Sequence, residues 1–424
     1  MEFNQTVLNP LALLITIIMC VTMLLIKKEK MVIPLIIVAC FITQLQRIVI
    51  LGVDFPMVRI ILIFGFLRIL LRQEKSTFKF NNIDKIILYF FLTRTILTTI
   101  LWASASTFIF MLGQASEMLG AYFLLRLTVN DLDDYDAIIK TIIIAGIPMA
   151  LFMTIEQATG GRNYFSIFGG VPDFDIIRDG KLRAQGAFSH PILAGTFGAT
   201  LLPLSWALWQ KSKRFLPLVG FGCAIIIVFN SSSSGPIATL GVGFFGIFFW
   251  LFNKYTKITR RLFFLTLILL HLGMNKPVWH LLGRIDLVGG STGYHRYRLI
   301  DAAVNNFFNW FLLGIKSTGV WGRQLFDITN QYILEGTRGG IIPLVLFIVI
   351  IVKCFQSVGT ARSKVADDIV SQKYIWALGV LLFAHTVTFI SVSYFGQMVI
   401  FYYLHLGMIA SLNNLPVITG ENNL

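Results

Sequence analysis

Long apolar runs separated by short polar segments recur along the chain from Leu11 to Leu412. Such runs are typical of helices that cross a hydrocarbon layer roughly 30 Å thick, where a helix satisfies its own backbone hydrogen bonds. We therefore predict an all-α polytopic membrane protein, a single domain over residues 1–424, with about 13 spans within a range of roughly 12 to 14. The predicted spans are 9–26, 31–50, 56–72, 85–102, 106–127, 137–158, 192–209, 215–230, 236–252, 259–273, 340–356, 374–391 and 395–412.

The composition supports the membrane assignment. Hydrophobic residues make up 56% of the 424 positions, charged residues make up 13%, and the mean hydropathy is +0.76. A soluble domain usually carries about a quarter charged residues, so that class is excluded. The first apolar run lacks a basic stretch before it and a small-residue cleavage site after it, so we interpret it as a retained helix rather than a signal peptide.

Lysine and arginine gather in every second predicted loop, as the positive-inside rule describes for cytoplasmic loops. The basic loops follow spans one, three, seven, nine and eleven, whereas the loop after span five is acidic from Asp131 to Asp136. This alternation predicts an outer N-terminus and a cytoplasmic C-terminus. The net charge of +14 is then mainly a topology signal, and we expect no nucleic-acid partner because no basic groove interleaved with aromatic residues is visible.

The four cysteines also argue against metal or redox chemistry. They lie in or at the edge of apolar runs, without metal-site spacing and without the pattern of a disulfide framework. The sequence therefore predicts no metal site and no cofactor.

Two polar segments on the predicted outer side, 160–191 and 274–340, interrupt this apolar pattern. The first combines glycines and aromatic residues with basic and acidic side chains, which are Arg162, Arg178, Lys181, Arg183, Asp173, Asp175 and Asp179. Mutual pairing in a folded outer loop explains any single charge. Taken together, glycines that let a backbone approach a ligand and arginines with planar donor forks favour phosphate recognition.

The second outer segment contains an amphipathic pattern from Arg298 to Leu313. Its apolar positions recur at helical spacing, which predicts a helix lying at the outer interface. His295, Arg296 and Arg298 would stand at the N-terminal end of this helix, where the helix dipole adds to their charge and suits a phosphate. A lid without any binding role is the structural alternative.

The order of several motifs along these segments resembles the O-antigen ligase and polysaccharide polymerase superfamily of bacterial envelope proteins. The resemblance covers residues 140–412. The matching motifs are Arg183-Ala-Gln-Gly186-Ala-Phe188-Ser-His190-Pro191 before a span, the turn from Ser231 to Gly235, Arg296 before an amphipathic helix ending at Gly314, and Asn330-Gln-Tyr-Ile-Leu-Glu335-Gly336 through Gly339 before the next span.

The resemblance implies a GT-C-like, metal-independent glycosyltransferase of the bacterial plasma membrane, with its active site facing the periplasm. Its donor would be an oligosaccharide linked to undecaprenyl diphosphate, and its other partners would be membrane lipids and, in the cell, chain-length regulator and flippase proteins. By this resemblance Arg183 and Arg296 hold the donor diphosphate and act in catalysis, and Arg178 and Arg298 support them. The remaining expected substrate-binding residues are His190, His295, Asn330, Glu335 and Arg338.

One position departs from the family pattern. Ligases of the family carry a His-Asn pair where this chain has Thr329-Asn330, and that histidine is thought to activate the acceptor. A base must then come from Asp327, Glu335, His295 or His190, or the reaction proceeds with little base assistance. We prefer Asp327, although each candidate also fits a structural role. The missing histidine favours a repeat-unit polymerase over a ligase that transfers glycan to lipid A core.

Charged residues inside the predicted spans are costly and tend to face a bundle interior or a cavity. We expect Arg47, Arg59 and Glu156 to line the mouth of the active cavity. Arg94 and Glu117 lie on consecutive spans, where an internal ion pair and a substrate role are both open.

Two rival functions remain at this stage. A lipid-linked glycan flippase or another carrier would use buried arginine and glutamate for translocation, but we find no internal symmetry of the kind common in carriers. A structural scaffold is weakened by the concentration of arginine and glycine in two outer segments.

Overall fold

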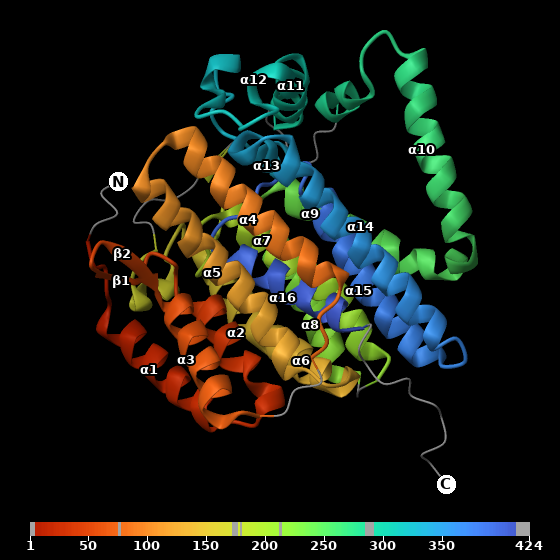
Figure 1. Ribbon diagram of the computed structural model, residues 1–424. Helices are drawn as coiled ribbons and strands as arrows, with labels where there is room; N and C mark the ends of the chain where they lie inside the picture. The colour runs from red at the N-terminus through yellow and green to blue at the C-terminus, as the bar shows by residue number, and fades with distance from the viewer. Residues whose placement is uncertain are drawn as a thin grey trace.

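The computed structural model describes residues 5–74, 78–171, 177–178, 180–211, 214–284 and 292–412. Over these ranges the chain is mostly helical, and its helices pack side by side into one bundle (Figure 1). Six helical segments among the described residues are long and apolar enough to cross a membrane. They are α4 (Asn82–Trp102), α5 (Ala105–Thr128), α6 (Leu132–Ala158), α7 (Pro191–Trp209), the helical run Ser234–Gly273 and α14 (Ile341–Lys364).

The other predicted spans also coincide with helices, most of them shorter. These are α1 (Pro10–Leu25), α2 (Val32–Phe41), α3 (Met57–Arg72), α8 (Phe215–Asn230), α15 (Ile369–Thr388) and α16 (Gln397–Ser411). The run Ser234–Gly273 comprises α9 (Ser234–Phe248), the 3-10 helix η3 (Phe249–Tyr255) and α10 (Thr256–Gly273), with a kink at Phe252. The helix α10, predicted as a short span, contains no buried residue and stands apart from the bundle in Figure 1.

The expected span 31–50 is wrong in its second half. The helix α2 has 10 residues, so at about 1.5 Å per residue it rises only half of a hydrocarbon layer. The chain then forms an antiparallel hairpin of β1 (Arg47–Ile50) and β2 (Val53–Pro56). Leu51 and Gly52 both have positive φ, as the tight turn of a two-residue hairpin requires. Arg47 therefore lies on a strand and not in a helix.

The alternate loops gather at two opposite ends of the bundle. At one end, which we call the cap end, lie residues 159–171, 177–178, 180–190, 231–233, 274–284, 292–340 and 389–396. Their contacts include hydrogen bonds from the Gln331 amide to the Phe389 carbonyl (2.8 Å) and from the Gln397 side chain to the Ala187 carbonyl (2.6 Å). At the other end a buried ion pair joins Arg126 to Asp84 at 2.8 Å. This arrangement agrees with the alternation of basic and non-basic loops in the sequence.

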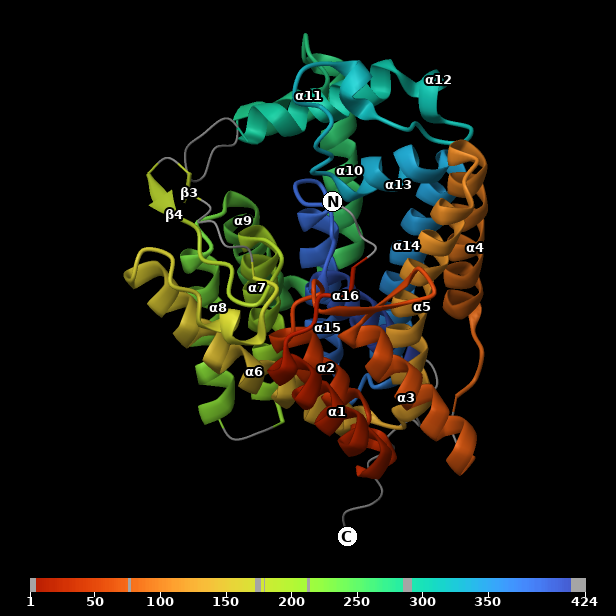
Figure 2. The ribbon, with the colours of Figure 1, turned by 90° about the vertical axis from the view of Figure 1, so that its left-hand side faces the viewer.

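Short elements make up the cap end. They are η2 (Tyr164–Phe168), the hairpin of β3 (Ile177–Arg178) and β4 (Lys181–Leu182), η4 (Val278–Arg284), α11 (Thr292–Asn305), α12 (Phe307–Trp310), η5 (Thr318–Trp321) and α13 (Gln331–Gly339). One further 3-10 turn, η1 (Lys28–Lys30), lies in the first basic loop. Figure 2 shows α11 and α12 above the bundle, with the β3–β4 hairpin beside the end of α9.

The amphipathic helix predicted from Arg298 to Leu313 is real but begins and ends elsewhere. The helix α11 begins at Thr292, and Asn306, with φ −105° and ψ 26°, separates it from α12. The indole nitrogen of Trp310 donates to the Ala303 carbonyl at 2.8 Å and folds α12 back onto α11. Of the three basic residues expected at the helix start, His295 lies in the first turn, whereas Arg296 and Arg298 lie beyond it.

Candidate functional site

The two principal arginines of the sequence analysis meet at one serine turn. Arg183 follows β4 and is 8% exposed, and its Nη2 donates to the Oγ of Ser233 at 2.7 Å. Arg296, on α11, donates from Nη2 to the Oγ of the next residue, Ser234, at 3.4 Å. Two segments more than a hundred residues apart in sequence therefore reach adjacent positions of the same turn.

The serine turn is also the beginning of α9. Ser233 is the N-cap residue, and no side chain caps the first amides of this helix. Ser233 donates its hydroxyl hydrogen to the Ser231 carbonyl at 2.7 Å, which fixes the turn. A helix start offers free amides and a partial positive charge, and two guanidinium groups add full charges there. This combination of groups suits an anion such as a phosphate.

The first of the two polar segments is held in place by Glu156 at the end of α6. The carboxylate of Glu156 accepts the amides of Gln185 and Gly186, both at 3.0 Å, and the Asn163 side chain donates to the Gly186 carbonyl at 2.7 Å. Gly186 has φ +57°, and a Cβ at this position would lie 2.8 Å from the sulfur of Met149. Glu156 thus positions the segment that follows Arg183, whereas the sequence analysis expected this side chain to line the mouth of the cavity.

His190 caps the start of α7. Its Nδ1 accepts the Ile192 amide at 3.1 Å, which places the ring proton on Nε2. Burial, followed by the charge of Arg183, lowers the pKa of His190 from its ordinary value of 6.5 to about 4, so the ring is neutral at pH 7. A neutral ring whose Nδ1 is occupied donates from Nε2 and does not serve as a base. His190 is therefore a positioning residue and hydrogen-bond donor beside Arg183.

The cap brings the preferred base candidate near α11. The ring Nε2 of His295 lies 3.1 Å from the carbonyl oxygen of Asp327, while the Asp327 side chain is exposed. Arg298 donates from Nη2 to the Arg323 carbonyl at 3.4 Å. The structure thus places the Asp327 backbone beside His295, the sequence neighbour of Arg296, whereas Arg298 contacts the cap backbone.

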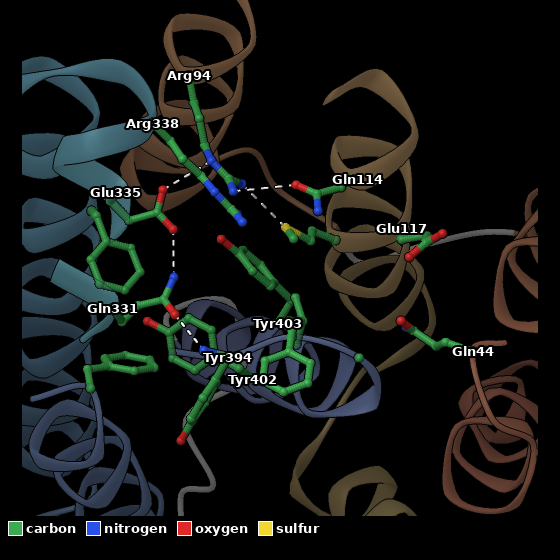
Figure 3. A pocket seen from close by; sticks show the side chains of 16 residues that line it. Gln44, Arg94, Gln114, Glu117, Gln331, Glu335, Arg338, Tyr394, Tyr402 and Tyr403 are labelled. Atoms are coloured by element: carbon green, nitrogen blue, oxygen red, sulfur yellow. Dashed lines mark hydrogen bonds and ion pairs between the residues drawn. The ribbon is translucent and has the colours of Figure 1, made fainter. Parts of the chain in front are cut away.

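A buried charge cluster lies at the other side of the cap end, where α13 meets α4 and α5. The Glu335 carboxylate pairs with Arg94 at 3.1 Å and accepts the Gln331 side chain at 2.6 Å. Arg338 extends beside Arg94 into the same cavity of about 90 Å³, which Tyr394 and Tyr403 also line (Figure 3). Glu335 is engaged by these contacts, so the structure does not present it as a free base.

Of the two alternatives left open for Arg94 and Glu117, an ion pair between them is not formed. Glu117 pairs with Arg59 at 2.6 Å, and Arg94 pairs with Glu335 instead. Arg47 lies 3.6 Å from Asp54 within the first hairpin. Neither Arg47, Arg59 nor Glu156 is among the residues that line the cavities described here.

Asn330, another expected substrate-binding residue, has a structural role. Its Oδ1 caps α13 by accepting the Ile333 amide, and its Nδ2 donates to the Ile390 carbonyl, both at 3.1 Å. The neighbouring hydroxyl of Thr329, at the position of the family histidine, is buried and has no hydrogen-bond partner among the described residues. The side chains of Arg178, Asp173, Asp175 and Asp179 lie outside the described residues.

Sequence reasoning treated Ser233 and Ser234 only as a turn and missed Gln331 and Tyr394 altogether. The run of four serines between two apolar spans was the available signal for the first pair. The described residues contain no group of three or more His, Cys, Asp or Glu that could hold a metal ion. No protein-family model matches the chain, and no curated protein matches it.

Proposed function

We propose that this chain is an integral-membrane glycosyltransferase that moves a glycan from undecaprenyl diphosphate to an acceptor sugar hydroxyl. The convergence of Arg183 and Arg296 on Ser233 and Ser234 at the start of α9 carries the proposal. Preorganised cations stabilise the charge that develops on a leaving diphosphate. In this proposal the helices of the bundle form the transmembrane body, and the cap end faces the outside of the bacterial plasma membrane.

The reaction breaks the bond between the anomeric carbon and the diphosphate oxygen, and the electron pair leaves with the diphosphate. A bond from the acceptor oxygen to the same carbon forms, and the hydroxyl proton passes to a base. The exposed carboxylate of Asp327 is our candidate, because its backbone carbonyl lies 3.1 Å from His295, next to Arg296. His190, neutral at pH 7, donates a hydrogen bond toward the anion.

We assign the reaction to repeat-unit polymerisation, because Thr329 stands where a ligase of the family would carry its activating histidine. Transfer to lipid A core is the alternative product. A lipid-linked glycan carrier would instead move its substrate across the bilayer unchanged. In the cell, a flippase would supply the lipid-linked repeat unit, and a chain-length regulator would act on the product.

The test is an assay of the purified chain in lipid nanodiscs with an undecaprenyl-diphosphate-linked oligosaccharide, with and without lipid A core. A ladder of lengthened glycans is the expected product. Arg183→Gln and Arg296→Gln should each reduce the transfer rate roughly a hundred- to a thousandfold, as the loss of one transition-state donor does in other enzymes. Arg183→Lys should recover only part of the loss because lysine lacks the planar fork.

Arg162→Gln is the matched control. Arg162 belongs to the same outer segment and is exposed, and it stacks on Tyr164 at 5.1 Å. This variant should keep the wild-type rate. Full activity of both Arg183→Gln and Arg296→Gln would refute the diphosphate clamp, and a wild-type chain that neither lengthens the glycan nor transfers it would refute the enzyme assignment.

A further inference from the structure

A second, larger cavity lies at the cap end next to the charge cluster. Its volume is about 630 Å³, within the range of about 300 to 1,000 Å³ that is usual for small-molecule sites. The outer ends of α4 and α5, the residues 315–318 that follow α12, and the helix α13 enclose it. Arg338, Tyr394 and Phe395 line both this cavity and the smaller one, so Arg338 stands at their junction.

Arg338 is the unusual group of this junction. Its guanidinium makes no hydrogen bond or ion pair with any described residue, and Figure 3 shows it reaching into the smaller cavity beside Arg94. The nearby Glu335 carboxylate already binds Arg94 and Gln331. The single carboxylate of Glu335 thus lies near two arginines but pairs with Arg94, which leaves an excess positive charge where the two cavities meet. Burial, followed by the charge of Arg94, lowers the pKa of Arg338 to about 10, and the side chain remains protonated at pH 7.

The lining of the larger cavity indicates what kind of anion fits. Hydroxyl groups come from three separate segments, with Thr98 and Thr107 on the outer parts of α4 and α5, and Ser317 and Thr318 after α12. Trp102 and Phe326 contribute aromatic faces, and the Lys316 ammonium lies 5.7 Å from the Trp102 ring. Hydroxyls bond sugar hydroxyls, and aromatic rings pack on the apolar faces of sugar rings. Arginine and lysine add selectivity for an acidic group.

We propose that this cavity binds the acceptor glycan and that Arg338 recognises a carboxylate or phosphate on it. The inference rests on the proposed transfer reaction and names its acceptor as an acidic saccharide. The position fits this role, because the ring of Phe395, which lines the cavity, lies 6.3 Å from the ring of His190 beside Arg183. The acidic group at Arg338 anchors the acceptor, and its reacting hydroxyl points toward the serine turn.

Calorimetric binding to the full chain in phosphatidylcholine nanodiscs tests this site without any turnover. The probes are a disaccharide that ends in glucuronic acid and the same disaccharide ending in glucose. Wild-type protein should prefer the acidic probe. Arg338→Gln should weaken binding of the acidic probe roughly ten- to a hundredfold, the value of a charge-assisted hydrogen bond, and should remove the preference. Arg162→Gln should change neither affinity.

Thr107→Trp offers a second route if Arg338→Gln does not fold. It keeps Arg338 but fills the cavity from α5, so binding of both probes should be lost. Equal affinity of wild-type protein for the two probes would overturn the proposal, and so would unchanged binding in both variants. Displacement of the acidic probe by phosphatidylglycerol in the bilayer, or equal affinity for inorganic phosphate alone, would also overturn it, because the anion would then be a lipid headgroup or a free ion.

Two variants distinguish failure of the proposed transfer reaction from failure of the proposed acceptor site. Arg183→Gln should abolish glycan transfer and leave binding of the acidic disaccharide intact, because Arg183 contacts Ser233 and does not line this cavity. Loss of disaccharide binding in Arg338→Gln with normal transfer of a neutral repeat unit would support this inference even if the donor chemistry needed revision.

Discussion

Replacing Glu335 with glutamine removes the carboxylate that lies beside both Arg94 and Arg338. Glu335 and Arg94 are 3% and 2% exposed, and their oxygen and nitrogen atoms are 3.1 Å apart. The change keeps the size of the side chain and leaves the hydrogen bond with Gln331 possible. Arg94 would retain weaker contacts to Gln114 at 3.5 Å, to the Met118 sulfur at 4.0 Å and to the Phe90 ring at 5.8 Å.

The expected loss of folding stability is large because Arg94 and Arg338 lose the same nearby negative charge. Removing one partner of a buried ion pair costs about 3–5 kcal/mol, since the remaining charge stays buried and uncompensated. At about 1.4 kcal/mol for each factor of ten, the ratio of folded to unfolded protein should fall by a factor of roughly a hundred to several thousand. Repulsion between Arg94 and Arg338 adds to the cost.

Arg94→Met provides the matched comparison. It removes one of the two arginines, and the Glu335 carboxylate then still faces Arg338. We therefore expect Arg94→Met to lower the free energy of unfolding clearly less than Glu335→Gln does. An isolated ion pair would show no such difference between its two variants. Glu117→Gln is the second control, because the Glu117–Arg59 pair is more exposed, at 13% and 14%, and should cost less.

Equilibrium unfolding in mixed micelles with increasing sodium dodecyl sulfate, followed by tryptophan fluorescence, measures these free energies. An exposed ion pair contributes at most about 1 kcal/mol. If the free energy of unfolding of Glu335→Gln lies within that distance of the wild-type value, the charge cluster is hydrated and not buried. If Arg94→Met lowers the free energy of unfolding as much as Glu335→Gln or more, the idea that the Glu335 charge compensates Arg338 as well as Arg94 is refuted.

Three further predictions concern single positions. Folding lowers the pKa of His190 from 6.5 to about 4, so the unfolded chain takes up a proton first as the pH drops, and stability should fall between pH 6.5 and pH 4. His190→Asn can still cap α7, and it should flatten this pH dependence in thermal unfolding. Gly314→Ala should lower the free energy of unfolding in the sodium dodecyl sulfate titration by about 1–3 kcal/mol or more, because Gly314 has φ +92° and a Cβ would meet the Thr337 carbonyl. Gly160→Ala, where φ is +72° but the space around a Cβ is open, should lower it less. Asp84→Asn, at the opposite end of the bundle, should cost about 3–5 kcal/mol by orphaning Arg126, yet leave binding of the acidic disaccharide by the folded fraction unchanged.

Most helices of this fold were predictable from the sequence. Hydrophobic runs determine where helices form, since each run must satisfy its backbone and bury its side chains in lipid or in neighbouring helices. The predicted range 215–230 matches α8 residue for residue, and 106–127 differs from α5 by one residue at each end. The error at 31–50 came from the hairpin turn at Leu51 and Gly52, whose apolar flanking residues continue the hydropathy of a span.

The candidate site was predicted only in part. The sequence singled out Arg183 and Arg296 from the position and composition of two polar segments, and from a family resemblance. It did not place them on Ser233 and Ser234, because that contact depends on how α7, α9 and α11 approach one another. It also assigned Glu156 to a cavity wall, where the structure uses the carboxylate to hold two backbone amides.

The sequence by itself thus determined the helical class, most of the span positions, the alternation of loop charge and the two polar segments that form much of the cap end. Hydropathy and loop charge are properties of short stretches, and these can be read without knowledge of the packing. Only the tertiary structure decided which charges meet, joining Arg94 to Glu335 rather than to Glu117 and leaving Arg338 at the junction of two cavities. Buried charges pair according to distance and desolvation in the packed bundle, and these are set by contacts between residues far apart in the chain.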